Sequence, residues 1–436
     1  MIIEQHYDDE VLIGLIDEAD KDAHVPACDT CSGTLESYRD LSAGLHDGSV
    51  WDERELSEAP SPKTANFLRD FAARSKAEDL AARPIVAKLA ADPSLIDQHP
   101  EWRTAGVVRG LLKHVDSINF TDPKSAVALA QQATDIADSI ASSYTSLSVL
   151  RAKAWREYGW ALYFVGSFEA SLSALDRAEE YIALERLADC DRAEISLVRA
   201  RVYRDIERFD DAVDLARKVA HVFRTYGNHQ RAAVAEGIES GVLICLGRHR
   251  EAIQIDSRIA NDCSLEPETR ACALNRTAWS FRELRDFEEA RKRYARAIAE
   301  FERLGLAEKR SMARWGLARV LLAEGSNAAS ALSVLEDLRS EFAEMGMSHD
   351  LALASIDTSE ALIVLNRAPE VAEICRDAIE YFRTAGLAYS AQAMTALSYL
   401  RESTNAGRLT PETVRHVRTY FEILPKQPHL LFAFSL

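Results

Sequence analysis

A histidine and two cysteines stand close together near the start of the chain, in the run His24-Val-Pro-Ala-Cys28-Asp-Thr-Cys31. Imidazole and thiolate groups bind zinc tetrahedrally, and a CxxC spacing lets both sulfurs reach one ion. His6 is the candidate fourth ligand, upstream of the run. Two imidazoles and two thiolates would leave no coordination position open for water. The pattern therefore predicts one Zn²⁺ per chain, structural or regulatory and not catalytic.

Two predicted amphipathic helices hold these ligands. Residues 7–20 place four aliphatic side chains on one stripe, and residues 27–45 form the second predicted helix. A zinc ion bridging the two helices would replace the hydrophobic core that a segment of about 50 residues cannot build alone.

An HxxxCxxC motif after an acidic helix, with a histidine near the N-terminus, resembles the zinc-binding anti-sigma domain of bacteria. The ligand positions and the apolar stripe of the second helix carry the resemblance: His6, His24, Cys28, Cys31, Leu35, Tyr38, Leu41 and Leu45. It covers residues 1–50 of 436. The resemblance implies a domain that binds a sigma factor and holds it away from RNA polymerase.

Charge is concentrated at the N-terminal end. Residues 1–60 hold 16 Asp and Glu against 3 Lys and Arg, whereas the formal net charge of the whole chain is −17. Such an acidic segment opposes direct binding to nucleic acid and favours a basic protein surface. A solvated acidic tail is the alternative interpretation. Trp51 lies among these acidic residues and either anchors a partner or packs on its own domain.

Composition predicts a cytoplasmic protein. The chain opens with acidic residues where a signal peptide has basic ones, and it contains no apolar run long enough to span a membrane. Only Cys28 and Cys31 form a close pair among the seven cysteines, as is typical of a reducing compartment. The other five are expected to be small buried side chains.

Residues 51–63 are predicted to be an acidic linker that Pro60 and Pro62 keep extended. Residues 64–436 are helical by pattern. The best repeat copy resembles the tetratricopeptide repeat through these residues: Trp155, Tyr158, Gly159, Leu162, Gly166, Phe168, Ser171, Leu175 and Ala178.

The small residue of the second helix recurs along this region. Its copies stand at positions 126, 171, 212, 252, 290, 331 and 372. The pattern predicts an all-α chain in which about seven helix pairs stack as an α-solenoid with a concave face. A helix over residues 411–424 is expected to close the array, with residues 430–436 packed on it.

The sequence contains no phosphate-binding glycine loop and no nucleophile elbow, so it predicts a protein that is not an enzyme. The first helix of each pair is expected to line the concave groove. Its exposed positions hold Arg156, Trp160, Tyr163, Arg201, Arg204, Asn275, Trp279, Arg282, Trp315 and Arg319. Arginine and aromatic side chains are typical of sites that bind proteins or acidic peptides. The alternative is that the Trp and Tyr side chains pack between repeats.

The first interpretation is a regulator whose zinc domain binds a sigma factor while the repeats bind a further protein or peptide. The second is a helical-repeat scaffold with a purely structural zinc. A third is autoinhibition, in which acidic residues 1–60 occupy the groove. Oxidation of Cys28 and Cys31 could also release the ion, so redox sensing stays open beside a structural role.

Overall fold

The computed structural model of the chain describes Leu12 and residues 24–46, 62–119, 122–141, 146–183, 185, 188–325, 327–385, 389–424, 427 and 429–433. Within these ranges every regular element is a helix and no strand occurs, which confirms the predicted all-α class. None of the helices described is long and apolar enough to cross a membrane.

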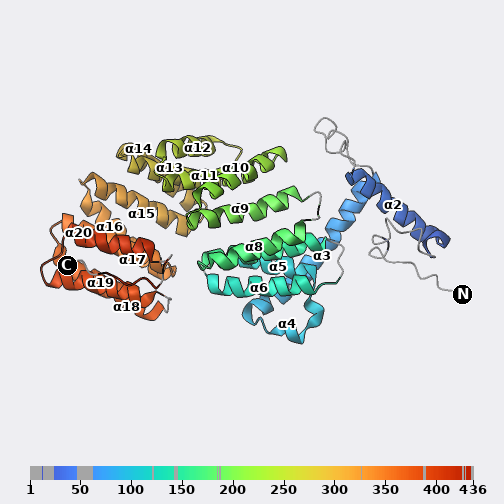
Figure 1. Cartoon of the computed structure of the whole chain (residues 1–436), viewed down its shortest axis with the longest axis horizontal. Coiled ribbons are helices and arrows are strands. Elements are labelled where there is room, and N and C mark those ends of the chain that lie inside the picture. Colours follow the sequence, from blue (N-terminus) through green and yellow to red (C-terminus); the bar gives the residue numbers. More distant parts are fainter. Residues whose placement is uncertain are drawn as a thin grey trace. The chain divides into compact units, whose positions relative to one another are not determined.

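The chain forms two compact units (Figure 1). The first comprises Met1–Val165 with Glu169–Asp191, and the second comprises Gly166–Phe168 with Arg192–Leu436. The helices of the first unit are η2 (Val25–Ala27), α2 (Asp29–His46), α3 (Pro62–Ala91), α4 (Leu95–Gln98), η4 (Pro100–Trp102), α5 (Ala105–Ile118), α6 (Pro123–Ser139), α7 (Leu147–Phe164) and α8 (Phe168–Ile182).

Helix α3 is a single helix that starts at Pro62, inside the range predicted as linker, and continues through Pro84. Proline is well suited to the first turn of a helix, where no backbone donor is needed. Helix α5 packs closely on α3 because Gly106 has no side chain: a Cβ atom there would lie 2.9 Å from the Glu78 carbonyl oxygen. Arg109 strengthens this contact by donating to Glu78 and Asp79, each over 2.8 Å.

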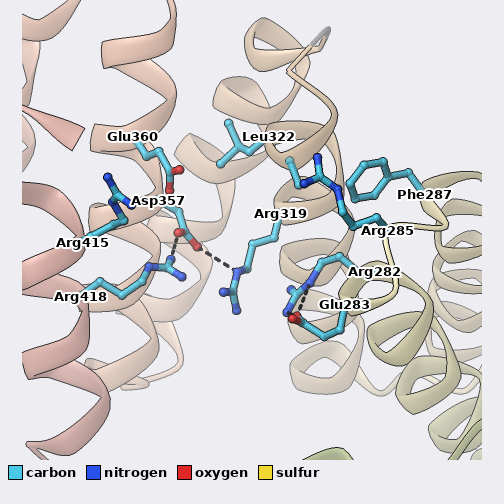
Figure 2. A pocket seen from close by; sticks show the side chains of 11 residues that line it. Arg282, Glu283, Arg285, Phe287, Arg319, Leu322, Asp357, Glu360, Arg415 and Arg418 are labelled. Carbon is cyan, nitrogen blue, oxygen red and sulfur yellow. Dashed lines mark hydrogen bonds and ion pairs between the residues drawn. The ribbon is translucent and has the colours of Figure 1, made fainter. Parts of the chain in front are cut away.

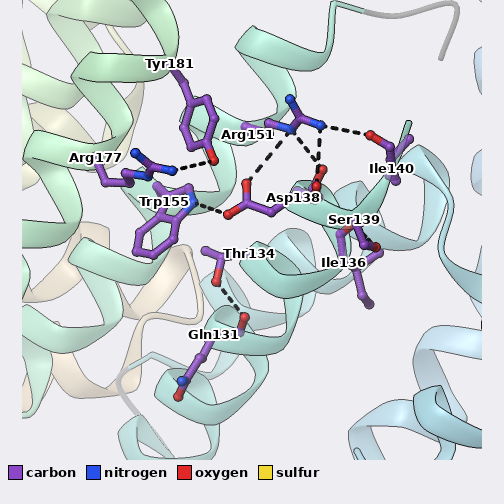
Figure 3. A network of polar contacts seen from close by, with 11 residues as sticks. Gln131, Thr134, Ile136, Asp138, Ser139, Ile140, Arg151, Trp155, Arg177 and Tyr181 are labelled. Atoms are coloured by element: carbon purple, nitrogen blue, oxygen red, sulfur yellow. Dashed lines mark hydrogen bonds and ion pairs between the residues drawn. The ribbon is translucent and has the colours of Figure 1, made fainter. Parts of the chain in front are cut away.

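Helices α6, α7 and α8 are joined by a polar network (Figure 3). From α7, Arg151 donates to the carbonyl oxygens of Ala137 over 3.1 Å and Ile140 over 2.8 Å, which satisfies acceptors at the end of α6. The indole N–H of Trp155 donates to Asp138 over 3.2 Å. The aromatic ring of Tyr181 lies beside the Arg151 guanidinium, 5.7 Å away. The network fixes the register of the first predicted repeat.

Small residues let α7 and α8 approach each other, as the repeat pattern predicts. The buried Ser171 hydroxyl donates to the Gly159 carbonyl oxygen over 2.7 Å. A Cβ atom at Gly159 would lie only 3.1 Å from Leu175. The best tetratricopeptide-like copy in the sequence is therefore a closely packed helix pair.

The second unit continues the helix pairs. Its elements, the first of which begins in the first unit, are α9 (Asp189–Asp205), α10 (Phe209–Thr225), α11 (His229–Cys245), α12 (His249–Asn261), α13 (Pro267–Glu283), α14 (Phe287–Arg303), α15 (Ala307–Glu324), α16 (Ala328–Glu344), α17 (Ser348–Val364), η5 (Ala368–Glu370), α18 (Val371–Ala385), α19 (Ser390–Asn405) and α20 (Pro411–Ile423). From α10 to α20, each α-helix contacts the next, and α11, α13, α15 and α17 also contact one another in turn. Contacts between the first helices of successive pairs are typical of the stacking in an α-solenoid.

The predicted small positions are buried in six of the seven copies, at Ala126, Ser171, Ala212, Ala252, Ala290 and Ala331. The seventh was placed one residue too late. Ala372 is only half-buried, whereas Val371 is fully buried. The 3₁₀ turn η5 precedes α18 directly, so Val371 takes the inward position at the start of that helix.

The end of the second unit follows the prediction. The Thr410 hydroxyl accepts the Thr413 backbone N–H over 3.2 Å and caps α20. The following segment packs back on this helix: the Tyr420 hydroxyl donates to the Leu430 carbonyl oxygen over 2.7 Å, and the Phe432 ring packs on the Tyr420 ring. Figure 1 shows α20 beside α17 and α19, which it contacts.

One expectation about the cysteines is wrong. Cys375 is buried, but Cys245 and Cys263 are exposed and Cys190 and Cys272 are half-buried. Cys245 ends α11 and Cys263 lies in the turn after α12, where the chain faces solvent. Cysteine type alone does not report burial, because a small side chain is tolerated at helix ends as well as in cores.

Candidate functional site

The His24, Cys28 and Cys31 side chains form one compact group. Their candidate ligand atoms all lie within 4.8 Å of one another, and the His24 Nε2 atom is 3.4 Å from the Cys31 Sγ atom. Among the residues that the structure describes, no other His, Cys, Asp or Glu belongs to such a group.

A short turn followed by a helix brings these three residues together. His24 precedes the 3₁₀ turn Val25–Ala27, in which Pro26 stands in the first turn. The Cys28 backbone N–H closes this turn on the Val25 carbonyl oxygen, and the Cys28 carbonyl oxygen accepts the Ser32 N–H over 2.9 Å. Both cysteines therefore lie at the start of α2, where the helix dipole favours thiolates.

The ligand group is packed against apolar side chains. Cys28 is 8% exposed and Cys31 is 1% exposed, while Val25, Leu35 and Leu12 are buried with them. Leu12 belongs to the predicted helix over residues 7–20, of which it is the only residue described. An apolar surrounding excludes competing water from the metal ligands.

One pair of donors has a separation that suits a tetrahedral zinc ion. Zn–N and Zn–S bonds of ordinary length place nitrogen and sulfur about 3.6 Å apart at the tetrahedral angle. The observed separation of 3.4 Å between His24 Nε2 and Cys31 Sγ is close to that value. The predicted fourth ligand, His6, lies outside the described residues. His24, Cys28 and Cys31 are thus the residues that would hold the ion.

The predicted groove residues of α7 and α9 are engaged within the fold. On α7, the Trp160 ring stacks on Tyr163 at 4.9 Å and Arg156 pairs with Glu157. On α9, Arg204 pairs with Asp205 over 2.7 Å, and Arg201 is half-buried. Trp51 lies outside the described residues.

The groove residues of α13 and α15 fall into two groups. Trp279 is 40% exposed, and the guanidinium carbons of Arg282 and Arg319 lie 4.5 Å and 5.7 Å from its ring centroid. These three side chains form one cluster. Asn275 is half-buried on α13. Trp315, expected at an exposed position, is 7% exposed instead.

Trp315 is buried because its indole N–H reaches a partner in the next repeat. It donates to a carboxylate oxygen of Asp357 on α17 over 2.7 Å. Burial of an indole is favourable once its N–H is paired. The alternative expectation, packing between repeats, describes this tryptophan.

Sequence reasoning missed the pocket that Arg282 and Arg319 share with later helices. A hollow of about 440 Å³ is bordered by these two arginines, by Asp357 of α17 and by Arg418 of α20 (Figure 2). Burial, and then the charge of neighbouring arginines, lowers the pKa of both Arg319 and Arg418 to about 10. Nothing in the sequence joins α15 to α20, although Arg415 and Arg418 share one face of that last helix.

No family model matches the chain, and no curated protein matches it. Solved structures of similar fold include a Rap protein complexed with competence and sporulation factor, at 17% identity over 81% of this chain and 100% of that chain, with a TM-score of 0.49. Aspartyl phosphate phosphatase F from Bacillus subtilis shares 11% identity over 76% of this chain and 97% of its own, with a TM-score of 0.48.

The apo form of the quorum sensor NprR from B. thuringiensis shares 10% identity over 72% of this chain and 99% of its own, with a TM-score of 0.44. These proteins resemble the chain in fold. At such identities and TM-scores, no ligand, partner or activity of theirs transfers to this chain.

Proposed function

We propose that the chain is a non-catalytic cytoplasmic regulator with a zinc-binding head. The head comprises residues 1–50, an acidic linker comprises residues 51–63, and residues 64–436 form the repeat body that binds a further protein or peptide. The observation that carries the proposal is the convergence of His24, Cys28 and Cys31 on one point at the start of α2. Imidazole and thiolates at this spacing are a zinc set.

The role of the metal in this proposal is to hold the head in its binding form. The described apolar cluster of the head contains five buried side chains, and two of them are the ligands Cys28 and Cys31. A segment of about 50 residues rarely buries enough apolar surface to fix two helices without a further crosslink. The zinc ion supplies that crosslink, and loss of the ion would release the binding surface.

The partner class is a sigma factor, as the HxxxCxxC resemblance implies. The head and the start of the linker are acidic in sequence, with 16 Asp and Glu against 3 Lys and Arg over residues 1–60. An acidic surface complements a basic one and speeds its capture. Covering a basic sigma surface would keep that factor from DNA and polymerase.

The experiment has two readouts on the full-length chain. Zinc content is measured by elemental analysis, and binding to each sigma factor of the source genome is measured by interferometry. Wild type should hold one zinc per chain and bind one sigma factor, and Cys28→Ser or Cys31→Ser should lose both properties. Cys263→Ser, which changes an exposed cysteine, is the matched control and should keep both.

A second candidate is a scaffold with a structural zinc, favoured by the packing of the ligands against Val25 and Leu35 of the same segment. The same experiment separates the two. One zinc per chain without binding to any sigma factor would support the scaffold. Absence of zinc from freshly reduced wild type would remove both candidates.

A further inference from the structure

The pocket of the second unit carries an excess of positive charge. Five arginines line it, namely Arg282, Arg285, Arg319, Arg415 and Arg418. Three carboxylates line it with them, those of Glu283, Asp357 and Glu360, and Glu412 pairs with Arg415 from outside the lining. The side chains come from α13, α15, α17 and α20 and from the turn after α13, so the pocket forms only when the repeats stack (Figure 2).

The most deeply buried carboxylate of the pocket, that of Asp357, already has partners within the protein. Asp357 is 1% exposed, accepts the Trp315 N–H over 2.7 Å and pairs with Arg418. Its Oδ2 atom lies 3.9 Å from the Arg319 Nε atom, beyond hydrogen-bond range. Asp357 therefore holds Arg418 in place and leaves most of the Arg319 guanidinium to face the pocket.

Arg282 has an N–H donor that makes no hydrogen bond to the described residues. Its side chain is 7% exposed and pairs with Glu283 through two nitrogens, Nε and Nη2. The other terminal nitrogen, Nη1, is buried and has no hydrogen-bond partner among the described residues. A buried N–H without an acceptor is unfavourable, so an acceptor brought by a ligand would be bound readily.

The guanidinium groups also repel one another. Burial, and then the charge of Arg282, lowers the pKa of Arg319 to about 10. Burial lowers the pKa of Arg418 to about 10 as well, with Arg319 as the largest neighbouring charge. Crowded like charges in a partly dry site favour a bound anion, which relieves the repulsion among all three.

We propose that this pocket binds an oxyanion group with two negative charges, a phosphate or a pair of neighbouring carboxylates. Arg282 and Arg319 are its principal donors, and Arg285 and Arg418 stand at its edges. Among the lining side chains arginines outnumber carboxylates, which favours a bound anion. Guanidinium forks bind phosphate and carboxylate oxygens in pairs, which gives geometric selectivity. A volume of about 440 Å³ suits a small ligand.

Arg285 lines the pocket from the turn after α13 and has a φ of 62°, in the left-handed region. Gly227 and Gly247 occupy the equivalent position in the turns after α10 and α11, whereas Glu207 and Asn366 occupy it after α9 and α17. Glycine therefore suits this backbone conformation, although other residues also adopt it.

The first experiment is calorimetric titration of the full-length chain at constant ionic strength, with inorganic pyrophosphate and with succinate as probes. Saturable binding of at least one probe is expected. Arg319→Gln should weaken it by about tenfold or more, because one charged fork is lost. Arg303→Gln, which removes an exposed arginine of α14 paired with Glu300, is the control and should bind as wild type does.

A second variant guards against misfolding of the first. Arg285→Gly suits the left-handed backbone, so it should fold at least as well as wild type and still bind the probe several-fold more weakly. Asn366→Gly alters the equivalent turn position after α17, with a φ of 58°, and should leave binding unchanged. This pair keeps the test informative if Arg319→Gln unfolds.

The two probes identify the source of the anion. Preference for pyrophosphate indicates a phosphorylated small molecule, and preference for succinate indicates a dicarboxylate. Binding of neither probe overturns the proposal, and so does binding that survives both Arg319→Gln and Arg285→Gly unchanged. The zinc head contributes no residue to this pocket, so the result is independent of the proposed zinc and sigma-factor function.

Discussion

Trp315 donates its indole N–H to a carboxylate oxygen of Asp357 over 2.7 Å, across 42 residues of sequence. Both side chains are buried, and Asp357 also pairs with Arg418. One carboxylate thus joins α15, α17 and α20 at the floor of the arginine pocket. Its environment explains why a charged side chain is retained in the helical core: cationic and N–H donors surround it.

Trp315→Phe should destabilise the second unit by about 1–2 kcal/mol or more, because the N–H that Asp357 accepts is lost and the smaller phenyl ring leaves part of the buried indole's space empty. The measurement is the free energy of unfolding by urea. Trp279→Phe, at an exposed tryptophan of α13, is the control and should change stability less. Equal effects from the two substitutions would contradict the assigned role of the Trp315–Asp357 bond.

Gly316 of α15 faces Tyr294 of α14, and a Cβ atom at Gly316 would overlap the tyrosine ring. Gly316→Ala should therefore destabilise the protein by about 1–3 kcal/mol, despite the higher helix propensity of alanine. Gly33→Ala in α2 is the control, since a Cβ atom there meets no neighbour within 4 Å. Thermal melts followed by circular dichroism would check this, and a neutral Gly316→Ala would show that α14 and α15 can separate.

Tyr294 itself has a buried hydroxyl without a hydrogen-bond partner among the described residues, and burial raises its pKa to about 12. Tyr294→Phe should be neutral or stabilising by up to about 1 kcal/mol, because an unsatisfied polar group leaves the core. The same urea titration measures it. A loss of stability above that size would indicate that the hydroxyl has an acceptor in solution.

The sequence predicted the helix pairs well because their determinants are local. Ser171, Ala212 and Ala290 are small residues at a recurring offset, and the close contact of two helices favours small side chains there. The caps at Asp122 and Thr410 were predictable for the same reason, since each acts on a backbone N–H three residues away. The seventh copy was misplaced because the turn Ala368–Glu370 shifts its register by one residue.

The arginine pocket could not be predicted from the sequence. The exposed face of a helix is assigned only if its register is known to within a residue, and Trp315 and Trp279, which were both expected at exposed positions, differ in exposure. Arg418 lies in the closing helix, and its place beside Arg319 depends on how α17 and α20 pack. Long-range stacking, which no local pattern encodes, decides which charges meet.

His349 and Asp350 at the start of α17 should have opposite effects on stability as pH changes. Burial lowers the pKa of His349 to about 4, whereas burial and then Glu308 raise the pKa of Asp350 to about 6. The buried neutral His349 should make the free energy of unfolding rise from pH 4 to pH 6.5, because the unfolded chain binds the extra proton over that interval. The buried protonated Asp350 should make it fall from pH 4 to pH 6. Each effect amounts to about 1.4 kcal/mol per unit of pKa shift. The two contributions to the free energy of unfolding nearly cancel in the wild-type protein.

Asp350→Asn should leave the effect of His349 uncompensated. The free energy of unfolding should then rise by about 3 kcal/mol between pH 4 and pH 6.5, relative to the wild-type profile. His349→Gln should give a profile that falls over the same interval. Urea unfolding at several pH values measures both. Tyr389, whose pKa is raised by burial and by Asp350, titrates well above this interval and does not interfere. Parallel profiles for the two variants would refute opposed titrations.

Removal of zinc should unfold the head and leave the second unit intact. The described head cluster relies on Leu12, Val25 and Leu35 beside the two ligand cysteines, which is too little apolar surface to order the segment alone. Amide hydrogen exchange of the full-length chain before and after chelation measures this. Residues 24–46 should lose protection, while residues 192–433 keep it because their core is independent of the metal. Cys31→Ser should reproduce the chelated pattern and Cys263→Ser should not. Unchanged protection of residues 24–46 without metal would mean that apolar contacts, and not a coordinated ion, hold the cysteines together.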